Sequence, residues 1–198
     1  MTVGRAIAFM TLVALPVTIA GLSSPAQVSS LPAQRKRISP HEASNSMVDG
    51  GRITIVYGRP FTRGRKIWGE LVRWDTIWTP GADEATLLTT DRLLSMAGRS
   101  IPPGTFSVYM LVDRTHPQLI INKQTGQWHT VYNQSQDLVH IDLQTSTVVK
   151  PVEQLTLAVV PQPNGGGVFS ITWDTTRYFV PFTVRPGGPH RRERRPAQ

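Results

Sequence analysis

Short runs of hydrophobic and polar residues follow one another along most of this chain. In the clearest run, residues 105–112, Phe106, Val108, Met110 and Val112 stand at every second position. A period of two places such side chains on one face of a β-strand. After the first 51 residues no helical period persists for three turns. The pattern therefore predicts strands rather than helices.

Similar runs recur about every 8–12 residues, with Gly, Pro, Asn or Asp between them, which is typical of an all-β domain. We predict an antiparallel β-sandwich, jelly-roll-like, with about nine or ten short strands. A short helix is compatible with residues 75–79. The other predicted strands include residues 53–57, 67–72, 85–90, 92–96, 119–122, 137–144, 155–160, 168–173 and 178–184.

The first 26 residues have the organisation of a signal peptide. Arg5 precedes an apolar stretch, residues 6–22, and Ser24-Pro25-Ala26 offers small residues for cleavage. The alternative is an uncleaved anchor, but the stretch is interrupted by Pro16 and is shorter than the roughly 20 residues of a membrane span. We therefore predict export, to the periplasm or the medium.

The rest of the chain divides by composition. Residues 27–51 are rich in Ser, Pro, Ala and Gly, which predicts a flexible linker ending at Asp49-Gly50-Gly51. Residues 52–185 form the predicted sandwich, and residues 186–198 a basic, disordered tail. There is no cysteine, so the fold depends on its core and not on disulfides.

The formal net charge of +8 belongs mainly to the two ends of the mature chain. Arg35-Lys36-Arg37 and Arg191-Arg192-Glu193-Arg194-Arg195 carry most of it, and the predicted sandwich between them is nearly neutral. Such tails either aid solubility or make weak contact with an anionic envelope surface. Export argues against nucleic acid as a partner. The oligomeric state stays open.

Several short sequence blocks carry a resemblance to a known family. They are Tyr57-Gly58-Arg59-Pro60, Gly64-Arg65-Lys66-Ile67-Trp68-Gly69-Glu70, Ile77-Trp78, Gly81-Ala82-Asp83-Glu84-Ala85-Thr86 and Pro103-Gly104-Thr105-Phe106-Ser107. In this order they resemble a bacterial family, the domain of unknown function 2911, from about residue 51 to residue 184. The resemblance implies an exported all-β protein and supplies no activity. This chain has Thr79-Pro80 where the family pattern has Arg-Thr, and His129 where it has Gly.

The stretch 63–86 concentrates tryptophan, basic residues and glycine, and it contains most of the candidate ligand-binding site. The basic residues Arg59, Arg63, Arg65, Lys66 and Arg73 fall within 15 positions. Arginine offers a planar fork for carboxylate or phosphate, and tryptophan offers a platform for a sugar or another flat ligand. We predict a binding module for an anionic or carbohydrate ligand of the envelope. The candidate ligand-binding residues are Arg59, Arg65, Lys66, Trp68, Trp74, Trp78, Asp83 and Glu84.

A structural explanation competes with this one. Arg65 and Arg59 would pair with Asp83 or Glu84 and fix the loop to the sheet. By the same reasoning Trp68 and Trp78 would fill the core, and for Trp74 both a core position and an exposed one stay open.

Two further functions remain open. A glycoside or ester hydrolase would need a carboxylate pair across a cleft, and a structural or assembly protein of the envelope would pair a sheet edge with a partner. No P-loop, dinucleotide fingerprint, nucleophile elbow or zinc motif is present, so we predict no cofactor and no metal. The candidate carboxylates are Glu70, Asp75, Asp83 and Glu84.

Overall fold

The structure, a computed structural model, describes residues 36–185. The predicted signal peptide, the first part of the predicted linker and the predicted tail lie outside these residues. Within them the chain forms eleven strands and one short 3-10 helix, η1 (Gln134–Gln136). No helix in this part of the chain is long and apolar enough to cross a bilayer.

Seven strands form the larger sheet, in the order β1-β2-β4-β7-β8-β9, and every pairing in it is antiparallel. The short strand β3 pairs with β7 beyond the end of β4, on the same edge. The strands are β1 (His41–Val48), β2 (Gly51–Gly58), β3 (Thr76–Trp78), β4 (Leu87–Thr90), β7 (Gly104–Val112), β8 (Gln118–Asn122) and β9 (Asp137–Asp142).

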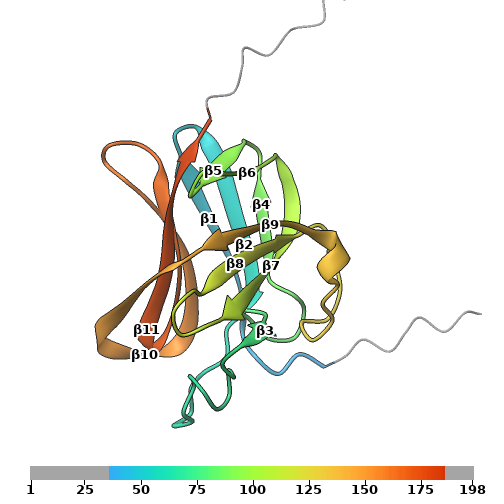
Figure 1. The fold of residues 1–198 in the computed structure, drawn as a ribbon, viewed down its shortest axis with the longest axis vertical. Helices are drawn as coiled ribbons and strands as arrows, with labels where there is room; N and C mark the ends of the chain where they lie inside the picture. Colours follow the sequence, from blue (N-terminus) through green and yellow to red (C-terminus); the bar gives the residue numbers. More distant parts are fainter. Residues whose placement is uncertain (1–35, 186–198) are drawn as a thin grey trace, which may run out of the picture. The chain divides into compact units, whose positions relative to one another are not determined.

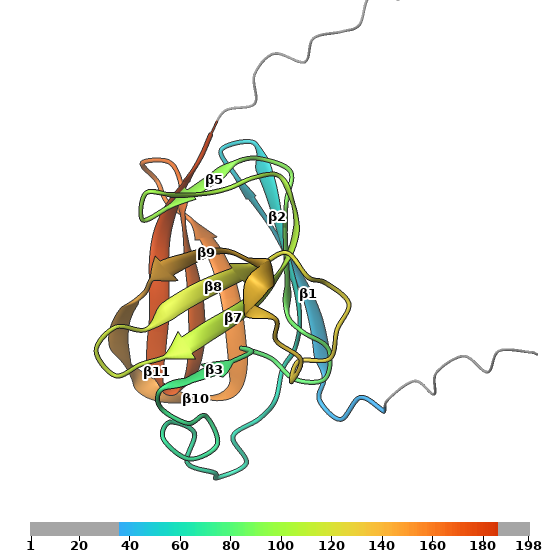
Figure 2. The same ribbon diagram turned by 45° about the vertical axis from the view of Figure 1, so that its right-hand side comes forward.

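Four strands form the second sheet, in the order β10-β11-β5-β6 (Figure 1). Its centre is a long antiparallel hairpin of β10 (Gln144–Pro161) and β11 (Gly167–Val184), joined by a glycine-rich turn. Strands β5 (Leu94–Met96) and β6 (Arg99–Ile101) complete it. Figure 2 shows the β10–β11 hairpin behind strands β7, β8 and β9 of the larger sheet.

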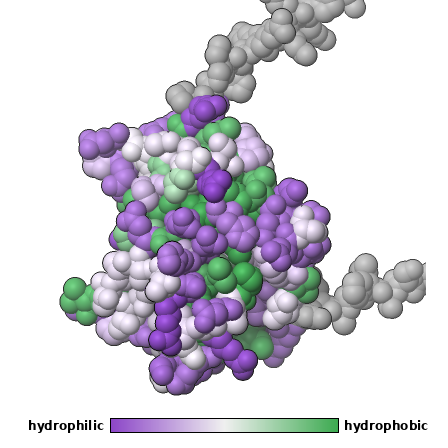
Figure 3. Space-filling model, in the orientation of Figure 1, coloured by the Kyte–Doolittle hydropathy of each residue, from purple (hydrophilic) through white to green (hydrophobic). Residues whose placement is uncertain are grey.

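The core lies between the sheets because both turn hydrophobic side chains toward each other. On β7 the predicted face of Phe106, Val108, Met110 and Val112 is buried. It shares one cluster with residues of β11, such as Phe169. On the face shown in Figure 3, hydrophilic residues surround smaller groups of hydrophobic ones. The prediction of an all-β antiparallel sandwich is confirmed.

Several local predictions were wrong. The predicted linker contains β1, which pairs with β2 along its whole length, because the Asp49-Gly50 turn closes a hairpin rather than ending a linker. Residues 67–72 form no strand, although Ile67, Trp68 and Val72 are buried. They fold as tight turns that pack hydrophobic side chains into the core. Residues 75–79 contain β3, not a helix.

Strands β10 and β11 of the second sheet are also longer than predicted. Strand β10 has 18 residues and continues through the polar stretch before residue 155. Its pairing with β11 shifts register between Thr147 and Val152, and again before Thr156. Bulges of this kind break the alternation of side chains without ending the strand. The sequence pattern therefore showed only the last part of β10, residues 155–160, and two separate parts of β11, residues 168–173 and 178–184.

Candidate ligand-binding site

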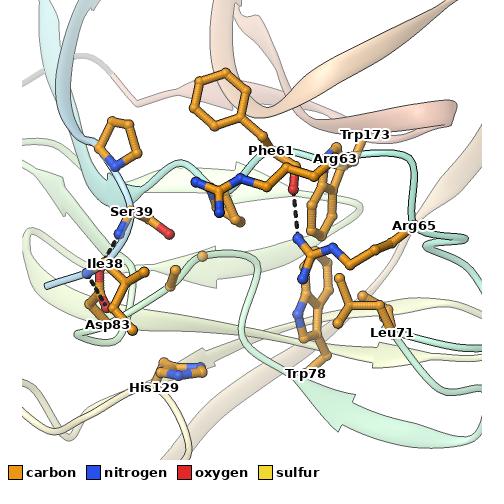
Figure 4. Close-up of a pocket in the computed structure, with 15 residues that line it drawn as sticks. Ile38, Ser39, Phe61, Arg63, Arg65, Leu71, Trp78, Asp83, His129 and Trp173 are labelled. Atoms are coloured by element: carbon orange, nitrogen blue, oxygen red, sulfur yellow. Dashed lines mark hydrogen bonds between the residues drawn. The ribbon is translucent and has the colours of Figure 1, made fainter.

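One end of the sandwich contains a cavity of about 390 Å³. Three chain segments enclose it: residues 37–41 before and at the start of β1, which we term the N-terminal strap, the loop 59–75 between β2 and β3, and the loop 79–86 between β3 and β4. His129 and Trp173 complete the lining from two other parts of the chain. Figure 4 shows how these side chains converge.

Two stacked tryptophans form the aromatic wall of the cavity. Trp78 ends β3 and Trp173 belongs to β11, and their ring centroids are 6.1 Å apart with an interplanar angle of 11°. The buried Trp173 also donates its Nε1 hydrogen to the Glu153 carbonyl at 3.3 Å. Trp68 packs edge-on against Trp78 at 5.8 Å from deeper in the core. The wall is therefore held by packing from both sheets.

Two arginines of the loop 59–75 line the cavity, and they differ in their hydrogen bonding. Arg65 donates from Nε to the Thr62 carbonyl at 2.9 Å and from Nη2 to the Phe61 carbonyl at 2.7 Å. These bonds fix its guanidinium to its own loop. Arg63 is exposed, and its guanidinium has no hydrogen bond or ion pair with any described residue. Figure 4 shows it reaching across the cavity from the loop toward Ser39.

The backbone of Arg63 is unusual and is anchored from outside the cavity. Its φ of 50° is uncommon for a residue with a long side chain. The Glu153 carboxylate accepts the Arg63 N–H at 2.9 Å and also the Thr62 hydroxyl. The Thr62 hydroxyl, the Arg63 amide and the charge of Arg65 hold the pKa of Glu153 below its usual value. This carboxylate therefore stays ionised and holds the strained turn in place.

The N-terminal strap is attached to the sandwich by Asp83. The carboxylate of this buried residue accepts the Ile38 and Ser39 amides at 3.2 Å and lies 3.1 Å from His41 Nε2. Arg37 pairs with Glu84 at 2.9 Å beside it. Burial alone would raise the pKa of Asp83, but the hydrogen bonds from His41 and the two amides outweigh it and lower the pKa. The strap thus forms a fixed wall of the cavity.

His129 adds a neutral polar group to the cavity lining, next to Asp83. Burial lowers its pKa, and the nearby charge of Asp83 only partly opposes this, so the ring is unprotonated at neutral pH. The His129 amide donates to the Asp83 carbonyl at 2.9 Å, and the Thr79 hydroxyl donates to the His129 carbonyl at 2.7 Å. The two departures from the family pattern are therefore joined at this site.

Glycine permits the close approach of two segments beside the cavity. A Cβ at Gly58, the last residue of β2, would lie 2.2 Å from the carbonyl oxygen of Ala82. No side chain fits there. This contact brings the loop 79–86 against the end of β2 and positions Asp83 under the strap.

Three of the predicted ligand-binding residues line the cavity: Arg65, Trp78 and Asp83. The other five do not, and they serve neighbouring contacts. Arg59 pairs with Glu42 and donates to the Leu155 carbonyl, and Lys66 pairs with Glu70 on the surface at 3.1 Å. Trp68 is buried, Trp74 is partly buried under the Arg114 guanidinium, and Glu84 pairs with Arg37.

The predicted clamp was wrong in its partners. Neither Arg59 nor Arg65 pairs with Asp83 or Glu84, because the strap supplies the partners of both acids. Trp68 fills the core as predicted, whereas Trp78 is only partly buried and faces the cavity. Trp74, for which a core position and an exposed one had both stayed open, is partly buried and stacks on Trp68 with ring centroids 6.4 Å apart.

The sequence reasoning missed three parts of the site: His129, Trp173 and the strap. The strap was assigned to a linker, and Trp173 stood in a predicted strand without any sign that it would meet Trp78. His129 had one signal, its difference from the family pattern. Nothing in the spacing of these residues indicates that they meet.

The cavity does not provide a carboxylate pair. Among the described residues that line it, Asp83 is the only acid, and its oxygens are occupied by the strap. The described residues also contain no group of three or more acidic, histidine or cysteine side chains arranged to hold a metal ion.

The fold and the cavity define the class of protein: an antiparallel β-sandwich with a small aromatic and cationic cavity at one end. A sequence model of the family described as protein of unknown function (DUF2911) matches residues 39–182, and the chain belongs to this family. The resemblance predicted from the sequence blocks is confirmed. No curated protein and no solved structure matches the chain.

Proposed function

We propose that this protein is an exported binding module whose cavity takes a small anionic or carbohydrate ligand of the cell envelope. One observation carries the proposal. The guanidinium of Arg63, which has no partner among the described residues, faces the same cavity as the stacked indoles of Trp78 and Trp173. A free cation beside an aromatic wall offers a ligand both charge and contact area.

The size and the stiffness of the cavity support this function. A volume of about 390 Å³ lies in the range of small-molecule sites, which are mostly preformed and apolar with a few polar groups. Here Asp83 fixes the N-terminal strap, and Glu153 fixes the turn at Arg63. A ligand would meet side chains already in place, which reduces the entropy lost on binding. Export rests on the signal-like first 26 residues.

A test compares the protein with a variant whose cavity is filled. Ser39 lies on the cavity side of the strap, so Ser39→Phe places a ring in the space. Ser100→Phe, on the exposed strand β6, adds the same bulk elsewhere. A panel of small organic anions and of mono- and disaccharides is titrated by calorimetry and by ligand-observed NMR.

We expect at least one compound class to bind the protein and the Ser100→Phe variant equally, and Ser39→Phe to lose that binding while keeping its melting temperature. If no compound in the panel binds, the proposal is contradicted. Binding that survives Ser39→Phe would place the site elsewhere and contradict it too.

A further inference from the structure

We infer that the ligand is an oxyanion, a carboxylate or a phosphate, joined to a flat or apolar body, and that Arg63 is the residue that selects it. The inference rests on the proposed function of the cavity as a binding site, and it names the class of ligand.

The first argument is the number of free donors and acceptors at the cavity. Asp83 accepts hydrogen bonds from the strap, and Arg65 has two donors bound to carbonyls of its own loop. Arg63 keeps its whole guanidinium fork unpaired among the described residues. The cavity therefore offers strong donors and almost no free acceptor, which suits an oxyanion.

The second argument is charge. Two guanidinium groups, those of Arg63 and Arg65, stand against the single carboxylate of Asp83 in the lining, and His129 is neutral because burial lowers its pKa. Glu153 lies outside the lining, where it binds the turn backbone and offsets part of the charge of Arg65. The unpaired guanidinium of Arg63 thus keeps a positive charge that a bound anion would neutralise.

The third argument is preorganisation. Arg63 adopts a left-handed conformation, and the Glu153 carboxylate and the Thr62 amide bond to the Glu153 carbonyl hold this turn. Strained residues of this kind persist where the surrounding structure fixes them, often at ligand sites. Here the conformation directs the side chain across the cavity toward Ser39 (Figure 4).

The fourth argument concerns the body of the ligand. Beyond the stacked Trp78 and Trp173, the lining continues through Phe61 to Leu71 and Ile38, which are 45% and 78% exposed at the mouth. A sugar would need several acceptors and donors around its ring. Apart from the Arg63 guanidinium, the lining side chains without a hydrogen bond to a described residue offer only a few polar groups, namely the Ser39 hydroxyl, the His129 ring and the Trp78 indole N–H. An apolar or aromatic body matches this surface better.

The test uses probes of one shape and different charge. Phenylacetate, phenylacetamide and phenethylamine share a benzyl group and are anionic, neutral and cationic, and phenyl phosphate separates phosphate from carboxylate. Each is titrated by calorimetry into the full mature protein and into Arg63→Gln and Arg63→Met. Arg99→Gln, on the exposed strand β6, removes the same charge far from the loop and is the matched control.

We expect one or both anions to bind at least about tenfold more tightly than phenylacetamide, since a charge-assisted hydrogen bond contributes about that much or more. Phenethylamine binds most weakly. Arg63→Gln and Arg63→Met lose the preference for anions, and Arg99→Gln keeps it. In the unaltered protein the preference also falls as NaCl increases, because salt screens the charge. The salt dependence is measured on the unaltered protein, so it does not depend on whether any variant folds.

Phenylacetamide binding as tightly as both anions, with Ser39→Phe blocking it, would overturn this inference and leave the proposed function standing. The same holds if a folded Arg63 variant keeps the preference for anions, or if the preference is unchanged by salt. Failure of all four probes together with the wider panel would overturn both.

Discussion

Replacing Asp83 by Asn isolates the contribution of its charge to the attachment of the strap. The side chain keeps its shape, and Asn accepts the φ of 68° at this position, so backbone strain does not confuse the result. In the Asn side chain only Oδ1 accepts hydrogen bonds, because Nδ2 is a donor. One of the donors that face the carboxylate, the Ile38 or Ser39 amide or the His41 ring, therefore loses its acceptor.

The size of the effect follows from the burial of the group. The Asp83 side chain is 6% exposed, so water does not replace the lost acceptor. A hydrogen bond to a charged group contributes about 1.5–3 kcal/mol. For a domain of this size each kcal/mol moves the melting temperature by about 2–4 °C. We expect Asp83→Asn to lower the melting temperature at pH 7 by about 3–12 °C.

The assay is thermal unfolding followed by circular dichroism, with urea unfolding as a second measure of the free energy. Glu84→Gln is the matched control, because its carboxylate is more exposed and pairs with an exposed Arg37. Exposed pairs contribute about 0–1 kcal/mol, so this variant should change little. A loss below about 0.5 kcal/mol for Asp83→Asn would refute the reasoning that this carboxylate anchors the strap.

Three other outcomes are expected. Because the pKa of Asp83 is lowered from 3.8, its stabilisation is complete above that pH and is lost as the pH falls through the lower folded value. The difference in unfolding free energy between the protein and Asp83→Asn should thus be present at pH 5 and shrink below about pH 4. Gly58→Ala forces a methyl group against the Ala82 carbonyl and should cost about 1–3 kcal/mol or more in urea unfolding. Tyr57→Phe removes the hydroxyl that accepts the buried Leu157 amide at 3.0 Å, and should cost about 1–3 kcal/mol in the same assay.

The fold was predictable where one face of a strand is buried and the other is not. Residues 53–57 show this on β2. On β7 hydrophobic residues alternate in the same way over residues 105–112, although Ser107 and Tyr109 on the opposite face are buried as well. The prediction failed where hydrophobic residues are buried without strand pairing, as at Ile67 and Trp68, whose turns mimic a short strand in sequence. It also failed at the bulges of β10, where alternation is interrupted although pairing with β11 resumes.

The site was predictable only in part, for a different physical reason. Arg65 and Trp78 lie in one stretch of unusual composition, and composition pointed to them. The pairing of Asp83 with His41, and the stacking of Trp78 on Trp173, depend on how distant segments meet in the sandwich. Local patterns contain no information on such contacts. The predicted arginine clamp does not form, because the partners of Asp83 and Glu84 come from residues 37–41, which the composition had assigned to a linker.

At this end of the molecule four tryptophans form a continuous series of ring contacts, from Trp74 to Trp68, from Trp68 to Trp78 and from Trp78 to Trp173. Indoles at such short range couple their electronic transitions, and the resulting near-ultraviolet optical activity depends on their mutual orientation. Local unfolding of this end alone would therefore weaken the near-ultraviolet signal, while the far-ultraviolet signal of the amides in the sheets would persist. The near-ultraviolet circular dichroism of these tryptophans therefore reports local unfolding at this end without an added label.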